Sequence, residues 1–118
     1  ADDEERLGPG DAQAPALAHD TVYAANNLGK VVALKAATGE EHWSNQLDFK
    51  ITAAPTVAGE TLLIGTEEGL VLGLDANTGD VVWEFRTGGK ITGSPIVVGD
   101  TMYVPSHDGK LYAVAGNS

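Results

Sequence analysis

Few side chains in this sequence have the type and spacing needed for catalysis or metal binding. The histidines His19, His42 and His107 stand too far apart in sequence to form a local metal motif. Ser44 and Ser94 have no recognisable histidine and carboxylate partners, and the sequence contains no G-x-S-x-G elbow. The absence of cysteine excludes a thiolate metal site, a cysteine nucleophile and a disulfide framework. We therefore predict no catalytic residue and no metal site.

Acidic residues in predicted turns are the one group that could bind a cation. Glu67-Glu68, Asp80 and His107-Asp108 could gather at one rim by repeat symmetry and hold Ca²⁺, which prefers several oxygen ligands. The sequence favours the alternative, in which these turns are simply solvated. The net charge of −10, from 17 acidic and 7 basic residues, argues against nucleic acid or an anionic membrane as a partner.

The elements that must position these residues recur every 40 residues. Residues 20–59 align with residues 60–99 without a gap, and 14 of the 40 pairs are identical. The identical pairs include Gly29/Gly69, Thr38/Thr78, Gly39/Gly79, Trp43/Trp83 and Pro55/Pro95. A repeat of this length is typical of β-propeller blades.

Each repeat contains four short apolar runs separated by turn residues. In one unit the runs cover residues 51–58, 61–65, 70–75 and 81–85, and glycine or asparagine in the turns between them supplies the positive φ of tight hairpins. The predicted fold class is therefore all-β, with propeller blades of four-stranded antiparallel sheets. Eleven strands are expected, from a first-strand remnant at 15–18 to a third strand at 111–115, which makes about 2.7 blades of a partial propeller.

The domain boundaries follow from the same register. Residues 1–13 are acidic and poor in β-formers, which indicates a flexible tail or linker. The repeats occupy residues 14–118, divided into a partial first strand (14–19), two full repeats (20–59 and 60–99) and a partial repeat (100–118). Consecutive apolar positions at 31–34 and 70–74 predict that both faces of these strands are covered.

Two segments share a small residue, a glycine six positions later and a tryptophan four positions after that. They read Ala33-Leu-Lys-Ala-Ala-Thr-Gly39-Glu-Glu-His-Trp43 and Gly73-Leu-Asp-Ala-Asn-Thr-Gly79-Asp-Val-Val-Trp83. The pattern resembles the tryptophan-docking motif of PQQ-like, quinoprotein-type β-propellers, and the resemblance covers residues 14–118. WD40 blades would instead show Gly-His and Trp-Asp pairs, which this chain lacks.

The resemblance implies that each tryptophan stacks on the small residue and the glycine peptide of the following motif. Trp43 would then cover Gly73 and Gly79, and Trp83 would cover Ala113. The predicted structural docking residues are Trp43, Trp83, Gly39, Gly79, Ala33, Gly73 and Ala113. A buried docking role predicts that Trp83→Ala costs about 3–5 kcal/mol of stability.

An arc of about 2.7 blades would expose apolar faces at both of its ends. Closed propellers typically have about 4–8 blades, so completion would come from a longer polypeptide or from several chains that assemble into a ring. An open filament is a third route. The predicted partners are therefore another protein or further copies of this chain, with no nucleic acid and no membrane span.

Two functions from different classes fit the sequence. The first is a non-catalytic β-propeller scaffold or binding module for proteins or ligands, as in the periplasmic assembly lipoproteins and extracellular sensor domains that the repeat resembles. The second is a fragment or subunit of a PQQ-dependent quinoprotein dehydrogenase, which would use PQQ and calcium. The sequence favours the first function, no cofactor, and a periplasmic or extracellular location.

Overall fold

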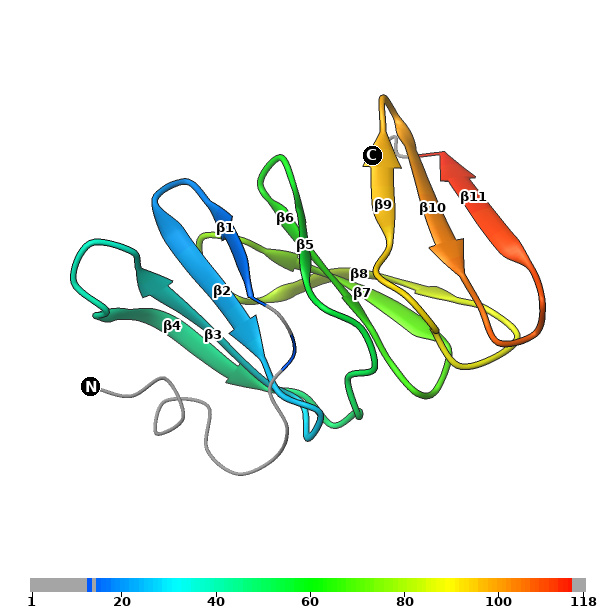
Figure 1. Cartoon of the computed structure of the whole chain (residues 1–118), viewed down its shortest axis with the longest axis horizontal. Helices are drawn as coiled ribbons and strands as arrows, with labels where there is room; N and C mark the ends of the chain where they lie inside the picture. Colours follow the sequence, from blue (N-terminus) through cyan, green and yellow to red (C-terminus); the bar gives the residue numbers. More distant parts are fainter. Residues whose placement is uncertain (1–12, 14, 116–118) are drawn as a thin grey trace.

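Every regular element in the described part of the chain is a β-strand. The computed structural model describes residue 13 and residues 15–115 (Figure 1). The strands are β1 (Ala16–Ala18), β2 (Thr21–Ala25), β3 (Lys30–Lys35), β4 (Glu41–Gln46), β5 (Thr56–Ala58), β6 (Thr61–Gly65), β7 (Leu70–Asp75), β8 (Val81–Arg86), β9 (Ile96–Val98), β10 (Thr101–Pro105) and β11 (Leu111–Ala115). No helix that could cross a membrane occurs in these residues.

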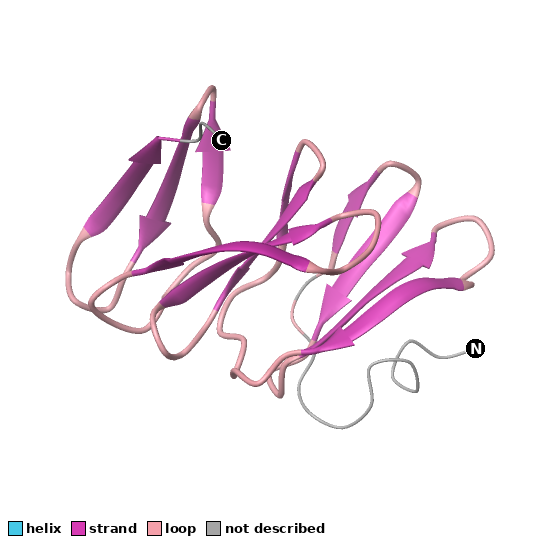
Figure 2. Cartoon of the chain, turned by 180° about the vertical axis from the view of Figure 1, so that it is seen from behind, coloured by secondary structure: helices cyan, strands magenta, loops and turns pink. Residues whose placement is uncertain are grey.

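The strands form three antiparallel sheets, each built from consecutive strands. The orders are β1-β2-β3-β4, β5-β6-β7-β8 and β9-β10-β11, and the sheets follow one another in an open arc (Figures 1 and 2). Ala18 pairs with Thr21 in the first sheet and Ala58 with Thr61 in the second, so the register repeats with the sequence. The predicted all-β fold of propeller blades, and its partial extent, are confirmed.

The predicted run at residues 51–58 is a strand over its last three residues only. Ile51 makes an isolated bridge to Thr66, and regular pairing begins at Thr56. Pro55 has no backbone N–H and therefore interrupts a ladder. Residues 52–55 instead cross from the last strand of one sheet to the first strand of the next.

The core lies between the sheets and forms two main clusters. The cluster between the first and second sheets contains thirteen buried residues, among them Tyr23, Trp43 and Leu72. The cluster between the second and third sheets contains six, among them Leu63, Val71 and Met102. Because successive residues of a strand point to opposite faces, β7 contributes to both clusters. The predicted cover on both faces is confirmed for β7.

The first strands of successive sheets are joined by side-chain hydrogen bonds that nearly repeat the 40-residue period. The His19 ring Nε2 lies 2.8 Å from the Gly59 carbonyl oxygen, and Ser94 donates to the Ala54 carbonyl oxygen at 2.9 Å. Thr52 donates to the Ile91 carbonyl oxygen at 2.6 Å. His19 and Ser94, which the sequence offered as possible chemistry, thus connect neighbouring sheets.

The two ends of the arc differ, although the sequence predicted apolar exposure at both. On the third sheet, Ile96 and Leu111 are 53% and 65% exposed. In the first sheet, Ala24, Val32 and Leu34 form a small buried cluster of their own, separate from the inter-sheet core. The expectation of an exposed apolar end face is therefore confirmed for the third sheet and wrong for this cluster of the first.

Candidate functional site

The joint between the first and second sheets is closed around Trp43. We call this arrangement the first joint: Tyr23, Trp43, Asn45 and the turn at residues 76–79. Trp43 lies opposite Ala33 on the neighbouring strand of its own sheet, and both side chains are buried. The Trp43 indole N–H donates to the Ala76 carbonyl oxygen at 2.9 Å. The ring is therefore buried with its one polar group satisfied, as buried tryptophan requires.

The turn of the second sheet is fitted closely to the Trp43 ring. Gly79 has a φ of +83°, and a β-carbon built on it would lie 2.7 Å from Cδ2 of Trp43. Only glycine satisfies both the left-handed backbone and this close approach. Asn45 Nδ2 donates to the Gly79 carbonyl oxygen at 2.8 Å. The turn is thus fixed by ring contact and by a side-chain hydrogen bond.

Tyr23 adds a third donor to the same turn. Its hydroxyl donates to the Ala76 carbonyl oxygen at 3.3 Å, and its ring centroid lies 6.2 Å from that of Trp43. Burial is the largest cause that raises the pKa of the Tyr23 phenol above 10.0, because it disfavours the charged form. Three side chains of the first sheet therefore bind one turn of the second.

Trp83 occupies the same motif position in the second sheet but is far more open. It lies opposite Gly73, and a β-carbon built on Gly73 would be 2.6 Å from Cζ2 of the ring. The side chain is 38% exposed, compared with 8% for Trp43. No hydrogen-bond partner for its indole N–H occurs among the residues that the structure describes.

The structure corrects two of the contacts that the motif implied. Gly73 lies beneath Trp83 of its own sheet instead of beneath Trp43, because the small residue and the tryptophan of one motif are cross-strand partners. Ala113 is exposed and alternates with Val114, which packs toward the second sheet, so Ala113 belongs to the opposite face and is not covered by Trp83. A β-carbon on Gly39 would meet nothing within 4 Å.

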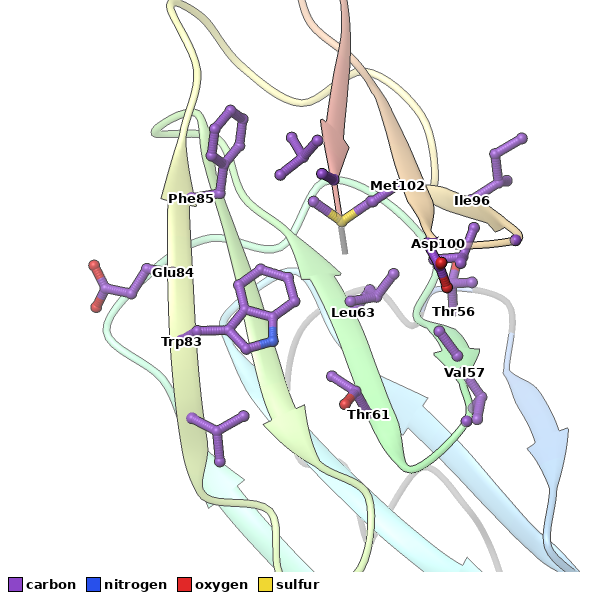
Figure 3. A pocket seen from close by; sticks show the side chains of 17 residues that line it. Thr56, Val57, Thr61, Leu63, Trp83, Glu84, Phe85, Ile96, Asp100 and Met102 are labelled. Atoms are coloured by element: carbon purple, nitrogen blue, oxygen red, sulfur yellow. The ribbon is translucent and has the colours of Figure 1, made fainter. Parts of the chain in front are cut away.

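An apolar cleft of about 1050 Å³ opens between the second and third sheets beside Trp83. We call it the Trp83 cleft. Its lining includes Val57, Leu63, Trp83, Phe85, Ile96 and Met102. Figure 3 shows Trp83 and Phe85 projecting from β8 with Met102 nearby, and the Glu84 carboxylate pointing away. The cleft therefore offers aromatic and aliphatic surface with a single indole N–H donor.

The third sheet is also held by a polar contact at the far end of this joint. The Tyr112 hydroxyl donates to Asp108 Oδ2 at 2.6 Å and accepts from the Gly88 N–H at 3.1 Å. The Tyr112 hydrogen bond is the largest cause that lowers the pKa of the exposed Asp108 carboxyl below 3.8. The Phe85 and Tyr112 rings meet edge to face at 5.9 Å.

The other chemical candidates of the sequence do not converge. Within residue 13 and residues 15–115, no group of three or more His, Asp or Glu side chains is placed to hold a metal ion. His42, His107 and the Glu67-Glu68 pair are exposed, and so is Ser44. Gln13, the last residue of the predicted tail, donates its backbone N–H to the Ala25 carbonyl oxygen at 2.8 Å. The rest of the predicted tail lies outside the described residues.

The sequence interpretation missed Tyr23, Asn45 and the Asp108–Tyr112 pair. A comparison of the two repeats position by position contains a signal for the first two, because Tyr23 and Asn45 align with Leu63 and Phe85. The motif search considered the shared residues and passed over these differences.

The sequence matches the family model described as outer membrane protein assembly factor BamB, a family of PQQ-type repeats, over residues 3–118. The chain belongs to this BamB-like family. The resemblance to PQQ-like propellers that the motif indicated is thereby confirmed. A search of curated protein sequences found no significant match.

Solved structures support the same BamB-like fold. BamB from Moraxella catarrhalis is 25% identical, with a TM-score of 0.75 over 82% of this chain and 31% of that chain. The computationally designed Ika8 protein is 18% identical, with a TM-score of 0.77 over 88% of this chain and 33% of that chain. The designed Ika4 protein is 18% identical, with a TM-score of 0.78 over 88% of this chain and 65% of that chain. The chain spans about a third of the first two.

Proposed function

We propose that this chain is a non-catalytic β-propeller module that binds protein partners or other ligands, either as part of a larger propeller or by assembling into one. The observation that carries the proposal is the Trp83 cleft, which presents a half-exposed tryptophan beside the uncovered strand β9. Contiguous exposed apolar surface with an aromatic centre is typical of interaction sites.

The family gives independent support for a protein partner and for a location. Its description names a factor in outer membrane protein assembly, a task carried out on other proteins at the cell envelope. We propose on this basis that the chain acts in the periplasm or outside the cell. The proposal includes no cofactor.

Peptide display on the immobilised chain tests the binding function. We expect enrichment of a consensus sequence whose synthetic peptide binds in the micromolar range, as modest peptide sites do. Failure of any sequence to enrich over a blank surface contradicts a binding role. Light scattering tests self-assembly separately: a stable monomer of 12.2 kDa contradicts assembly by this chain alone.

Titration with PQQ and Ca²⁺ tests the alternative, in which the chain is a fragment or subunit of a quinoprotein dehydrogenase. We expect no change in the quinone absorbance and no reduction of an electron-accepting dye. A saturable absorbance change with dye reduction contradicts the non-catalytic proposal.

A further inference from the structure

We propose that the Trp83 cleft binds an extended segment of a partner protein, apolar along one face, whose glycine-containing turn lies on Trp83 and whose strand pairs with β11. The inference rests on the proposed function and names its site and the chemistry of its partner. The contrast between the Trp83 cleft and the first joint carries it.

The first joint shows what this motif binds. There the tryptophan ring lies against Gly79 and its indole N–H donates to the Ala76 carbonyl oxygen at 2.9 Å. Trp83 has the same placement on its own sheet, over Gly73, yet its N–H has no partner in the described part of the chain. A donor beside apolar surface favours a backbone carbonyl, because a carbonyl satisfies the N–H while the ring stays dry.

The edge of β11 supplies main-chain groups at the same place. In the first two sheets the third strand pairs on both sides, β3 with β2 and β4, and β7 with β6 and β8. Within the described residues β11 pairs with β10 alone. Val114 and Ala115 of β11 line the cleft, so a strand added at this edge reaches the cleft. Exposed strand edges bind extended segments by main-chain hydrogen bonds.

Two differences between the repeats indicate an apolar partner. Tyr23 and Asn45 donate hydrogen bonds to the turn at the first joint. Their counterparts are Leu63 and Phe85, and both line the cleft. Polar groups that entered this cleft would lose water without gaining those two donors. The segment therefore presents aliphatic side chains to the cleft and one carbonyl to Trp83.

The charge around the cleft indicates a basic partner. The strand ends and turns at this end of the sheets carry seven acidic residues, Asp20, Glu40, Glu41, Glu60, Asp75, Asp80 and Asp100. Lys35 is the one cation at this end among the described residues, and it already lies 3.6 Å from Glu40. Asp100 lines the cleft itself. Lysine or arginine beside the turn of the segment complements this field.

A peptide that copies residues 74–86, with phenylalanine in place of Trp83, is the first probe. A second peptide carries lysine in place of Asp75 and Asp80. Because the chain has two tryptophans, Trp43→Phe leaves Trp83 as the reporter. We expect both peptides to shift Trp83 emission to shorter wavelength and to protect it from iodide. The lysine peptide should bind about tenfold more tightly at low salt, a difference that shrinks as salt screens it.

Variants locate the binding site. Trp83→Ala should weaken peptide binding at least about tenfold, as loss of a central aromatic residue does. Ile96→Lys changes an exposed residue of the lining and should weaken it similarly without affecting the fold. Leu17→Ala, at an exposed position of β1 outside the lining, should leave it unchanged. A peptide with valine in place of Gly79 should not bind, because a β-carbon meets the ring.

The outcomes separate this inference from the proposed function. No emission change at millimolar peptide, or equal affinity of the Trp83→Ala and Ile96→Lys variants, overturns the inference. Displayed peptides that bind these variants as well as the unaltered chain leave the binding function intact and also overturn it. An oligomer that Ile96→Lys converts to a monomer shows that a second copy fills the cleft, which contradicts a different partner.

Discussion

The two tryptophans stand in the same motif, 40 residues apart, and lie in different surroundings. Trp43 is buried, hydrogen-bonded to Ala76 and in contact with Gly79. Trp83 covers the small residue of its own sheet in the same way but keeps an exposed edge and an indole N–H without a partner in the described residues. The comparison teaches that the motif fixes how the ring lies on its own sheet, whereas the neighbouring sheet decides how much of it is buried.

The largest expected difference between the joints is the effect of removing each ring. Trp43→Ala should cost about 3–5 kcal/mol, as loss of a fully buried aromatic side chain does. Trp83→Ala should cost about 1–2 kcal/mol, because the exposed part of the ring contributes little burial. Urea unfolding of both variants measures the two values. Equal losses would mean that the joints are equivalent in solution.

Substitution of the paired glycines tests the ring contact alone. Gly39 and Gly79 have φ of +79° and +83°, so alanine at either position should cost about 1–2 kcal/mol in backbone strain. Gly79→Ala should cost about 1–3 kcal/mol more, because its β-carbon collides with Trp43, whereas Gly39→Ala meets open space. If thermal unfolding gives both variants the same loss, Trp43 does not press on this turn.

Removal of the Tyr23 hydroxyl should have a smaller effect. Tyr23→Phe loses the bond to the Ala76 carbonyl oxygen and should cost about 0.5–1.5 kcal/mol. The folded-state pKa of Tyr23 is raised, so its contribution is fully present below pH 10.0 and is lost as the pH rises through the raised value. The variant should therefore lose less stability in alkali. Tyr103→Phe is the matched control, and a similar alkaline response in both variants would rule out Tyr23 as the source.

The smallest expected effect lies at the second joint. The folded-state pKa of Asp108 is lowered, so its contribution is present above pH 3.8 and is lost as the pH falls through the lowered value. Asp108→Asn should reduce the acid-dependent part of the urea midpoint, and Tyr112→Phe should do the same by removing the hydrogen bond. A pH profile unchanged by either variant would show that this pair does not stabilise the third sheet.

The fold was predictable because its signals are local. Turn glycines and alternating apolar runs marked nearly every strand, and the predicted limits of Leu70–Asp75 and Leu111–Ala115 match β7 and β11. The run at 51–58 was predicted too long, because apolar residues in a crossing segment look the same as those in a strand. The candidate site was less accessible. The contact between Asp108 and Tyr112 spans a hairpin, and no motif signals it.

The sequence by itself determined the 40-residue period, the register of the hairpins and the pairing of each tryptophan with a small residue, since all of these arise within one sheet. Only the tertiary structure decided that Trp43 is buried and Trp83 half-exposed, and that a cleft lies beside the second ring. The physical reason is that burial depends on the surface stacked against each sheet. A repeat specifies its own sheet and leaves that opposing surface to its neighbour.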